Sequence, residues 1–124
     1  MKKILILLLL LFSLFVNAKT WFVANAVRFD VEEEWEKCDI RVSIDDDWKI
    51  NVYADTHHTI RKIKELGGFE DEDGNSHVLW GGINQDGNEC TMALTKFKNI
   101  PYLRLTITFE AQGLDVYYML MPDD

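Results

Sequence analysis

The chain has 124 residues, of which 21 are acidic and 13 are basic, so its formal net charge is −8 at pH 7. A chain of this length fits one domain with a modest core. The acidic balance argues against nucleic acid and anionic membrane surfaces as partners, because phosphate binding needs a basic footprint. It favours a cationic protein as the partner.

The first 18 residues have the order of a cleavable secretory signal peptide. Lys2 and Lys3 give a positive start, residues 4–16 form an apolar run, and small residues precede a cleavage position after Ala18. The run is short for a membrane-spanning helix, which needs about 20 apolar residues. We therefore expect a secreted or periplasmic protein with one mature domain, residues 19–124, and no stable membrane insertion. Cleavage would leave 11 basic residues against 21 acidic ones, a net charge of −10.

Alternating apolar and polar residues dominate the mature chain and predict β-strands. A first strand begins at Thr20, and its apolar side chains share one parity: Trp21, Val23, Val27, Phe29 and Val31. An acidic cluster over residues 32–36 interrupts the pattern. A hairpin over residues 38–54 follows, with aspartates at its turn, 45–47. Trp21 and Trp48 match the apolar parity of their strands, so we predict both to be core residues.

Residues 59–66 fit two structures. Ile60, Ile63 and Leu66 lie three apart before two glycines, which is typical of a short helix. The β-branched content and the neighbouring strands favour a fourth strand with a bulge. We predict the strand and keep the short helix as the alternative.

The alternation continues to the end of the chain. Asp-Gly turns at 73–74 and 86–87 are typical of hairpins. Further strands are expected over 77–83, 89–97, 102–110 and 115–121. Seven to eight short strands with tight turns predict an all-β antiparallel meander. Closure would remove its exposed edges, so we predict a closed or nearly closed small barrel filled by side chains. A two-layer β-sandwich is the alternative.

Cys38 and Cys90 are the only cysteines. An even count in an exported chain predicts a disulfide, and both cysteines share the parity of inward-facing apolar neighbours. The bridge would close a loop of about 50 residues and stabilise the fold by roughly 4 kcal/mol. Two buried free thiols are the alternative. Neither cysteine has the neighbours of a catalytic thiol.

Every candidate catalytic or metal-binding motif in the sequence is explained at least as well by a structural role. Asp71, Asp73 and Asn75 alternate oxygen ligands as calcium loops do, but the glycine and glutamate of an EF-hand are missing. A solvated hairpin turn is the favoured interpretation of these residues. The histidines lack a zinc-ligand spacing, since the adjacent His57 and His58 must point to opposite faces of a strand. We predict no metal, no cofactor and no enzymatic activity.

The aromatic residues are the most informative feature for function. Trp35 lies among Glu33, Glu34 and Glu36, where an exposed ring in an acidic rim would suit a protein partner. A ring that caps one end of the barrel is the favoured interpretation of Trp35, and contact with a partner is the alternative. Of two adjacent tyrosines one must face outward, and we assign Tyr118 to the partner-binding surface.

These features predict a non-enzymatic binding protein that holds another protein through an acidic, aromatic surface. A small, acidic, disulfide-bridged antiparallel barrel is similar to the general plan of periplasmic lysozyme inhibitors, which implies an inhibitor of a cationic hydrolase. The resemblance covers architecture and charge alone, so it assigns no residue. A carrier of a small ligand inside the barrel is the alternative, and a structural envelope module is a third hypothesis. A sizeable cavity would favour the carrier, and an exposed apolar patch around Trp35 would favour a protein partner.

Overall fold

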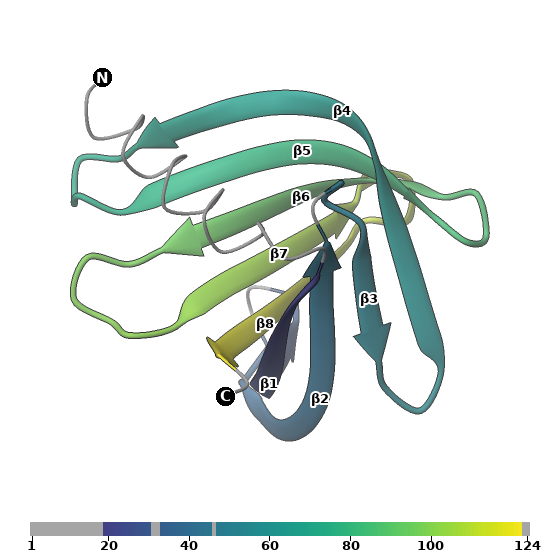
Figure 1. Ribbon diagram of the computed structural model, residues 1–124, viewed down its shortest axis with the longest axis horizontal. Helices are drawn as coiled ribbons and strands as arrows, with labels where there is room; N and C mark the ends of the chain where they lie inside the picture. The colour runs from purple at the N-terminus through teal and green to yellow at the C-terminus, as the bar shows by residue number, and fades with distance from the viewer. Residues whose placement is uncertain (1–18, 31–32, 46, 123–124) are drawn as a thin grey trace.

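A computed structural model describes residues 19–30, 33–45 and 47–122, which form an eight-stranded antiparallel barrel (Figure 1). In chain order the strands are β1 (Lys19–Phe29), β2 (Glu36–Asp45), β3 (Ile50–Tyr53), β4 (His57–Glu70), β5 (Ser76–Asn84), β6 (Glu89–Lys96), β7 (Leu103–Phe109) and β8 (Leu114–Pro122). Each strand pairs with the next, and β1 pairs with β8, which closes the barrel. The predicted closed meander is confirmed.

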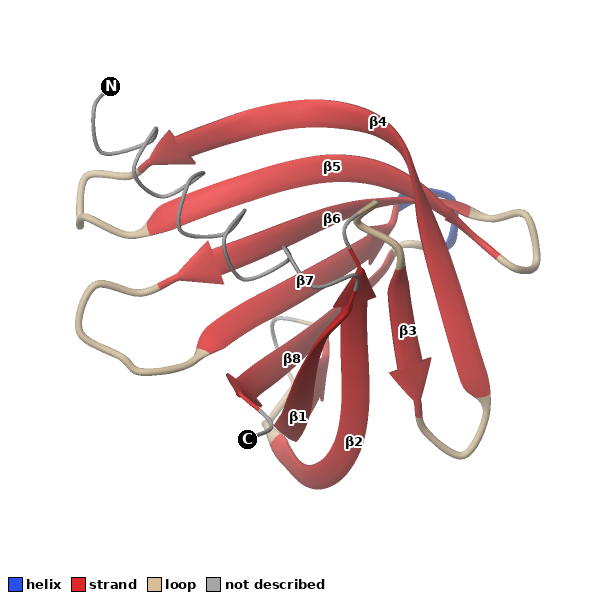
Figure 2. Cartoon of the chain, in the orientation of Figure 1, coloured by secondary structure: helices blue, strands red, loops and turns tan. Residues whose placement is uncertain are grey.

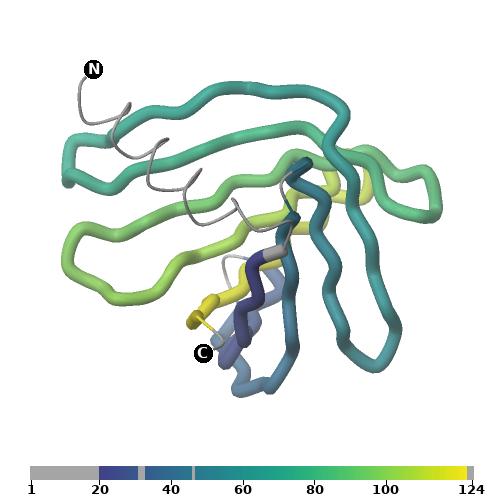
Figure 3. The backbone as a smooth tube through the Cα atoms, viewed as in Figure 1, coloured from purple at the N-terminus to yellow at the C-terminus, as the bar shows by residue number. Residues whose placement is uncertain are grey.

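The connections between strands are short, as the path of the chain shows (Figure 3). Within the described residues the helical structure is one 3-10 turn, η1 (Glu110–Gln112), drawn in blue in Figure 2. No helix among the described residues is long and apolar enough to cross a membrane. The signal peptide predicted over residues 1–18 lies outside the described residues.

The barrel interior is a packed core over most of its length. Alternate residues of each strand point inward, as closure of a small barrel requires. The side chains with almost no exposed surface come from strands all round the barrel: Ile44, Ile50, Trp80, Met92, Leu94, Leu105 and Leu120. Burial of this apolar surface is the main force that holds the fold together.

A β-bulge changes the parity of β1. The register between β1 and its two neighbours shifts between Ala24 and Ala26, so Phe22 and Ala24 point inward before it and Val27 after it. The predicted parity was therefore wrong in the first half of the strand. Trp21 is 37% exposed and stacks on Tyr53 with ring centroids 5.4 Å apart, so it is not a core residue. An extra residue in one strand breaks a strict period of two.

Residues 59–66 belong to β4, so the predicted strand is confirmed and the helical alternative is wrong. The register of β4 against β5 shifts twice, between Lys62 and Lys64 and between Glu65 and Gly67. The residues at the two shifts, Ile63 and Leu66, are 49% and 47% exposed. The three-residue spacing that resembles a helix is thus produced by two bulges in one strand.

Three hairpins, β2–β3, β4–β5 and β5–β6, share one turn geometry. Its first residue is Asp45, Asp71 or Asn84. The Oδ1 of that residue accepts hydrogen bonds from the backbone N–H groups two and four residues further on, at 2.9–3.0 Å. The fourth position has a left-handed backbone and is occupied by Gly74, Gly87 and, in the β2–β3 turn, Trp48 with φ 63°. Short polar side chains at the first position are typical of such turns.

The predicted disulfide is absent, because Cys38 and Cys90 are free thiols. Cys38 lies on β2 and Cys90 on β6, four strands apart in either direction round the barrel. Neighbouring strands are about 4.8 Å apart, and a disulfide needs Cα atoms within about 7 Å, so opposite walls cannot be bridged. The Sγ of Cys38 instead donates to the carbonyl oxygen of Ala24 at 3.1 Å.

Candidate functional site

The end of the barrel at which β1, β3, β5 and β7 finish is hollow. A cavity of about 300 Å³ opens there. Residues of the β5–β6 hairpin and of η1 border its opening. Residues of six strands (β1, β3, β4, β5, β7 and β8) line it. The buried side chains in its wall are Val52, Ile60, Ile107, Val116 and Tyr118. The aliphatic members of this group are β-branched and too short to fill the space between opposite walls. The opposite half of the interior is filled by larger residues such as Trp80 and Met92.

Polar side chains surround the mouth of this cavity. His58, Asp86, Asn88 and Gln112 line it from the strand ends and the loops, beside apolar residues such as Phe109. An apolar wall with a few polar groups at one end is typical of small-molecule sites. The mouth cavity therefore has the composition of a ligand site.

Tyr118 lies inside the barrel and lines the mouth cavity, with only 9% of its surface exposed. Its assignment to an outer partner-binding surface is corrected, because Tyr117 is the tyrosine that faces outward. No described residue forms a hydrogen bond with the Tyr118 hydroxyl. Burial raises the pKa of Tyr118 to about 12, so the hydroxyl stays protonated at neutral pH and remains a donor.

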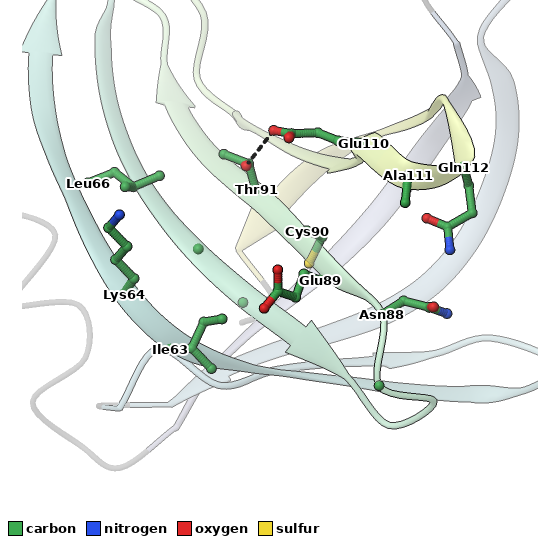
Figure 4. Close-up of a pocket in the computed structure, with 13 residues that line it drawn as sticks. Ile63, Lys64, Leu66, Asn88, Glu89, Cys90, Thr91, Glu110, Ala111 and Gln112 are labelled. Carbon is green, nitrogen blue, oxygen red and sulfur yellow. Dashed lines mark hydrogen bonds between the residues drawn. The ribbon is translucent and has the colours of Figure 1, made fainter.

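A second hollow lies on the outer wall, above β4, β5, β6 and η1 (Figure 4). This groove has a volume of about 520 Å³. The bulged residues Ile63 and Leu66 form one side of it, and Glu110 lies on the other, where it accepts a hydrogen bond from Thr91 Oγ1 at 3.2 Å. Gly81 contributes no side chain to the floor. The groove is larger than the mouth cavity, and both hollows are open to solvent. Charged residues such as Lys64, Glu89 and Glu110 border the groove.

Trp35 packs against the outer wall of the barrel. The guanidinium carbon of Arg28 lies 4.8 Å from the centroid of its ring, and Tyr117 meets it edge-on at 6.4 Å. Trp35 is consequently half-buried, and the large apolar side chains that are exposed lie elsewhere. Its neighbours Glu33, Glu34 and Glu36 are exposed, as expected for an acidic rim.

The calcium candidate is a hairpin turn. The Oδ1 of Asp71 accepts the amides of Asp73 and Asn75, and its Oδ2 lies 2.8 Å from Nε2 of His77. Both oxygens of this carboxylate are therefore engaged in holding the turn. In residues 19–30, 33–45 and 47–122 no group of three histidine, cysteine, aspartate or glutamate side chains is placed to hold a metal ion.

The predicted residues are thus divided among separate places. Trp35 and its glutamates lie on the outer wall, Tyr118 lies in the mouth cavity, and the two cysteines lie on opposite strands. Comparison of the chain with protein-family models, with curated proteins and with solved structures finds no match. The sequence favoured a filled interior and left a barrel-interior pocket as the alternative; at this end of the barrel the valines at inward positions of β3 and β8 leave a cavity.

Proposed function

We propose that the protein is an exported, non-enzymatic binding protein that carries a small, mainly apolar ligand in the mouth cavity. The observation that supports this is the cavity of about 300 Å³ inside the barrel wall. This volume is at the lower end of the range of small-molecule pockets, about 300–1,000 Å³. A surface for a protein partner around Trp35 has less support, because the ring packs against Arg28 and Tyr117.

The lining suggests the chemistry of the ligand. Aliphatic side chains such as Val52 and Ile107 would bury an apolar or aromatic body, which is worth about 25 cal/mol for each Å² removed from water. The Tyr118 hydroxyl can donate a hydrogen bond to one acceptor, such as a carbonyl or ether oxygen. Polar groups of the ligand would meet His58 and Gln112 at the rim.

The groups that face the cavity suit binding better than catalysis. The phenol of Tyr118 has a pKa raised to about 12, so it cannot act as a base at neutral pH. The Tyr118 hydroxyl is not enclosed, so solvent can reach this donor when the cavity is empty. A ligand with an acceptor would keep the donor satisfied, whereas a purely apolar ligand would leave it unpaired at a cost in free energy.

A fluorescence titration with N-phenyl-1-naphthylamine tests the carrier. This neutral aromatic probe should bind the protein saturably at one site. Val116→Phe fills the cavity from the inside and should weaken binding by about tenfold or more, since lost apolar contact of about 1.4 kcal/mol is tenfold in affinity. Val23→Phe adds the same volume to the outer face of β1, where Val23 lies between the buried Phe22 and Ala24, and should bind as the wild type does. Unchanged binding by the Val116 variant would exclude the cavity as the site.

A protein partner is the second candidate, favoured by the exposed positions of Glu33, Glu34 and Glu36 beside Trp35. These carboxylates would attract a cationic surface, and an inhibitor of a cationic hydrolase is the specific form of this proposal. The assay is hydrolysis of bacterial cell walls by lysozyme with the protein in excess. Inhibition that is lost when all three glutamates are replaced by glutamine would support it, and full lysozyme activity would remove this form of it.

A further inference from the structure

The outer wall over β1, β8 and β7 carries a column of alternating aromatic rings and guanidinium groups. We name Trp35, Arg28, Tyr117, Arg104 and Phe97 the arginine ladder. The guanidinium carbon of Arg28 lies 4.8 Å from the ring centroid of Trp35 and 4.5 Å from that of Tyr117. That of Arg104 lies 5.8 Å from Tyr117 and 5.0 Å from Phe97. Both cations therefore flank one tyrosine ring.

Sheet register builds this arrangement. β8 lies between β1 and β7, Arg28 is opposite Tyr117 in the β1–β8 pair, and Arg104 is opposite Met119 in the β7–β8 pair. Arg104 is thus diagonal to Tyr117 on the same face, within reach of a long side chain. The bulge in β1 helps to place Arg28 on the outer wall. Even-numbered residues such as Phe22 and Ala24 point inward before the bulge, whereas after it Val27 points inward and Arg28 outward.

Among the described residues the two guanidinium groups have no anionic partner. Neither forms a salt bridge or a hydrogen bond with any of those residues. The Nε atoms of Arg28 and Arg104 are both shielded from solvent, and no described residue offers them an acceptor. Cation–π contacts stabilise the faces of a guanidinium but leave its in-plane N–H donors unsatisfied. Burial is the main cause that lowers the pKa of Arg104; Tyr117 opposes this shift, and the charge of Arg28 adds a smaller lowering.

We propose that Arg28 and Arg104 together bind a small oxyanion beside Tyr117. Stacking of Arg28 between two rings fixes the plane of its guanidinium, so its donors are directed along the edges of the ladder. Such a fixed fork matches the paired oxygens of a phosphate or carboxylate group. Binding would engage the terminal N–H groups of the two guanidinium groups, which are not enclosed as the Nε atoms are, and would relieve the repulsion between the two cations.

A phosphate group suits the site better than a carboxylate, and a small anion better than a polymer. Two guanidinium groups can share the charge of a phosphate, whereas a carboxylate engages one fork. The exposed Glu33, Glu34 and Glu36 near Trp35 would repel an extended polyanion. This site is on the outer wall and is independent of the mouth cavity proposed above.

NMR of the arginine Nε–H groups tests the proposal on the whole protein. Sodium phosphate is added at constant ionic strength, and sodium chloride and sodium acetate serve as separate arms. The Nε–H signals of Arg28 and Arg104 should shift saturably with phosphate and at least fivefold more weakly with acetate, as about 1 kcal/mol for a lost charged hydrogen bond implies. Arg61, exposed on β4, is the internal control and should not shift. Absence of saturable shifts, or equal shifts of all three arginines, would overturn the site.

Two conservative variants separate binding from folding. Arg104→Lys keeps the charge and removes the fork, so phosphate affinity should fall about fivefold or more. Arg61→Lys is the matched control and should bind phosphate as the wild type does. Near-ultraviolet circular dichroism verifies that both variants keep the packing of their tryptophans. If folded Arg104→Lys bound phosphate with unchanged affinity, the two-arginine site would be refuted.

Discussion

Asp71 and His77 are joined by a hydrogen bond in which Oδ2 of the aspartate lies 2.8 Å from Nε2 of the histidine. The other imidazole nitrogen lies 2.9 Å from Oγ1 of Thr95 on β6, and the ring stacks on Phe69 of β4. One carboxylate thus connects the β4–β5 turn with side chains of three strands. The hydrogen bond from His77 is the main cause of the lowered pKa of Asp71, and two backbone amides add to it.

Asp71→Asn should remove the negative charge that this hydrogen bond stabilises and keep the turn. Asn84 holds the same position in the β5–β6 turn and makes the same two backbone hydrogen bonds, so asparagine is competent there. A carboxyl group whose pKa is lowered on folding stabilises the protein above its unfolded pKa of about 3.9 and loses that effect as the pH falls through its folded pKa. Urea denaturation should therefore show the variant to be less stable at pH 7 and equally stable near pH ~2. A difference that is independent of pH would contradict the stabilisation of the ionised Asp71 carboxylate in the fold.

The adjacent glycines of β5 should respond differently to alanine. A Cβ at Gly82 would lie 2.9 Å from both the carbonyl oxygen of Arg61 and Cγ2 of Ile60, and it would also collide with Cε of Met92. We expect Gly82→Ala to lower the free energy of unfolding by about 1–3 kcal/mol, the usual cost of overpacking. At Gly81 the nearest atom would be Cβ of Lys64 at 3.6 Å, an ordinary contact. Gly81→Ala is the matched control and should be neutral or stabilising by up to about 1 kcal/mol; equal losses for both variants would contradict this packing.

The closed barrel was predictable because its strands alternate apolar and polar residues and its turns carry aspartate, asparagine and glycine. The prediction failed in the first half of β1, where one residue is added to the strand and the bulge near Ala24 reversed the assignment of Trp21. In β4 the predicted strand with a bulge is confirmed, but the strand has two bulges, at which Ile63 and Leu66 are exposed. A bulge inserts a residue without altering composition, so a single sequence gives little sign of it.

Parity places a side chain inside or outside but does not say what it faces. Cys38 and Cys90 were both expected to point inward, yet their strands are opposite each other in the closed barrel. The mouth cavity depends on distances across the interior, which periodicity does not contain. The same applies to the arginine ladder, because Arg28 and Arg104 meet at Tyr117 only after β1 closes on β8.

Trp48 has a left-handed backbone conformation, and the equivalent positions of the other two turns are occupied by Gly74 and Gly87. Its φ is 63°, and its ring packs on Trp80 with centroids 4.9 Å apart, which offsets the strain. Left-handed backbone costs a non-glycine residue about 1–2 kcal/mol. Trp48→Ala loses the ring and keeps the strain, whereas Trp48→Gly loses both. Chemical denaturation should show the glycine variant to be about 1 kcal/mol more stable than the alanine variant, and the reverse order would contradict a strained turn.

Both cysteines should be detected chemically as free thiols. In denaturant without reductant, reaction with Ellman's reagent should give two thiols per chain, because Cys38 and Cys90 are unpaired. In the native protein at pH 8 the reaction should be slow, since burial raises the pKa of both thiols and the thiolate is the reactive form. Reductant should leave the unfolding midpoint unchanged. Fewer than two thiols in denaturant would show that a disulfide forms.

Cys90 should make the fold sensitive to alkaline pH. Desolvation raises its pKa to about 11, well above the value of about 8.5 for a cysteine in an unfolded chain. A group whose pKa is raised on folding contributes stability below its unfolded pKa and loses it as the pH rises through its folded pKa. The wild-type protein should therefore lose free energy of unfolding between pH ~8.5 and pH ~10, relative to Cys90→Ala measured in parallel. The alanine variant cancels the titration of lysines and of Tyr118, which both proteins share. Parallel stability curves across this range would mean that the Cys90 thiol is not desolvated in the folded barrel.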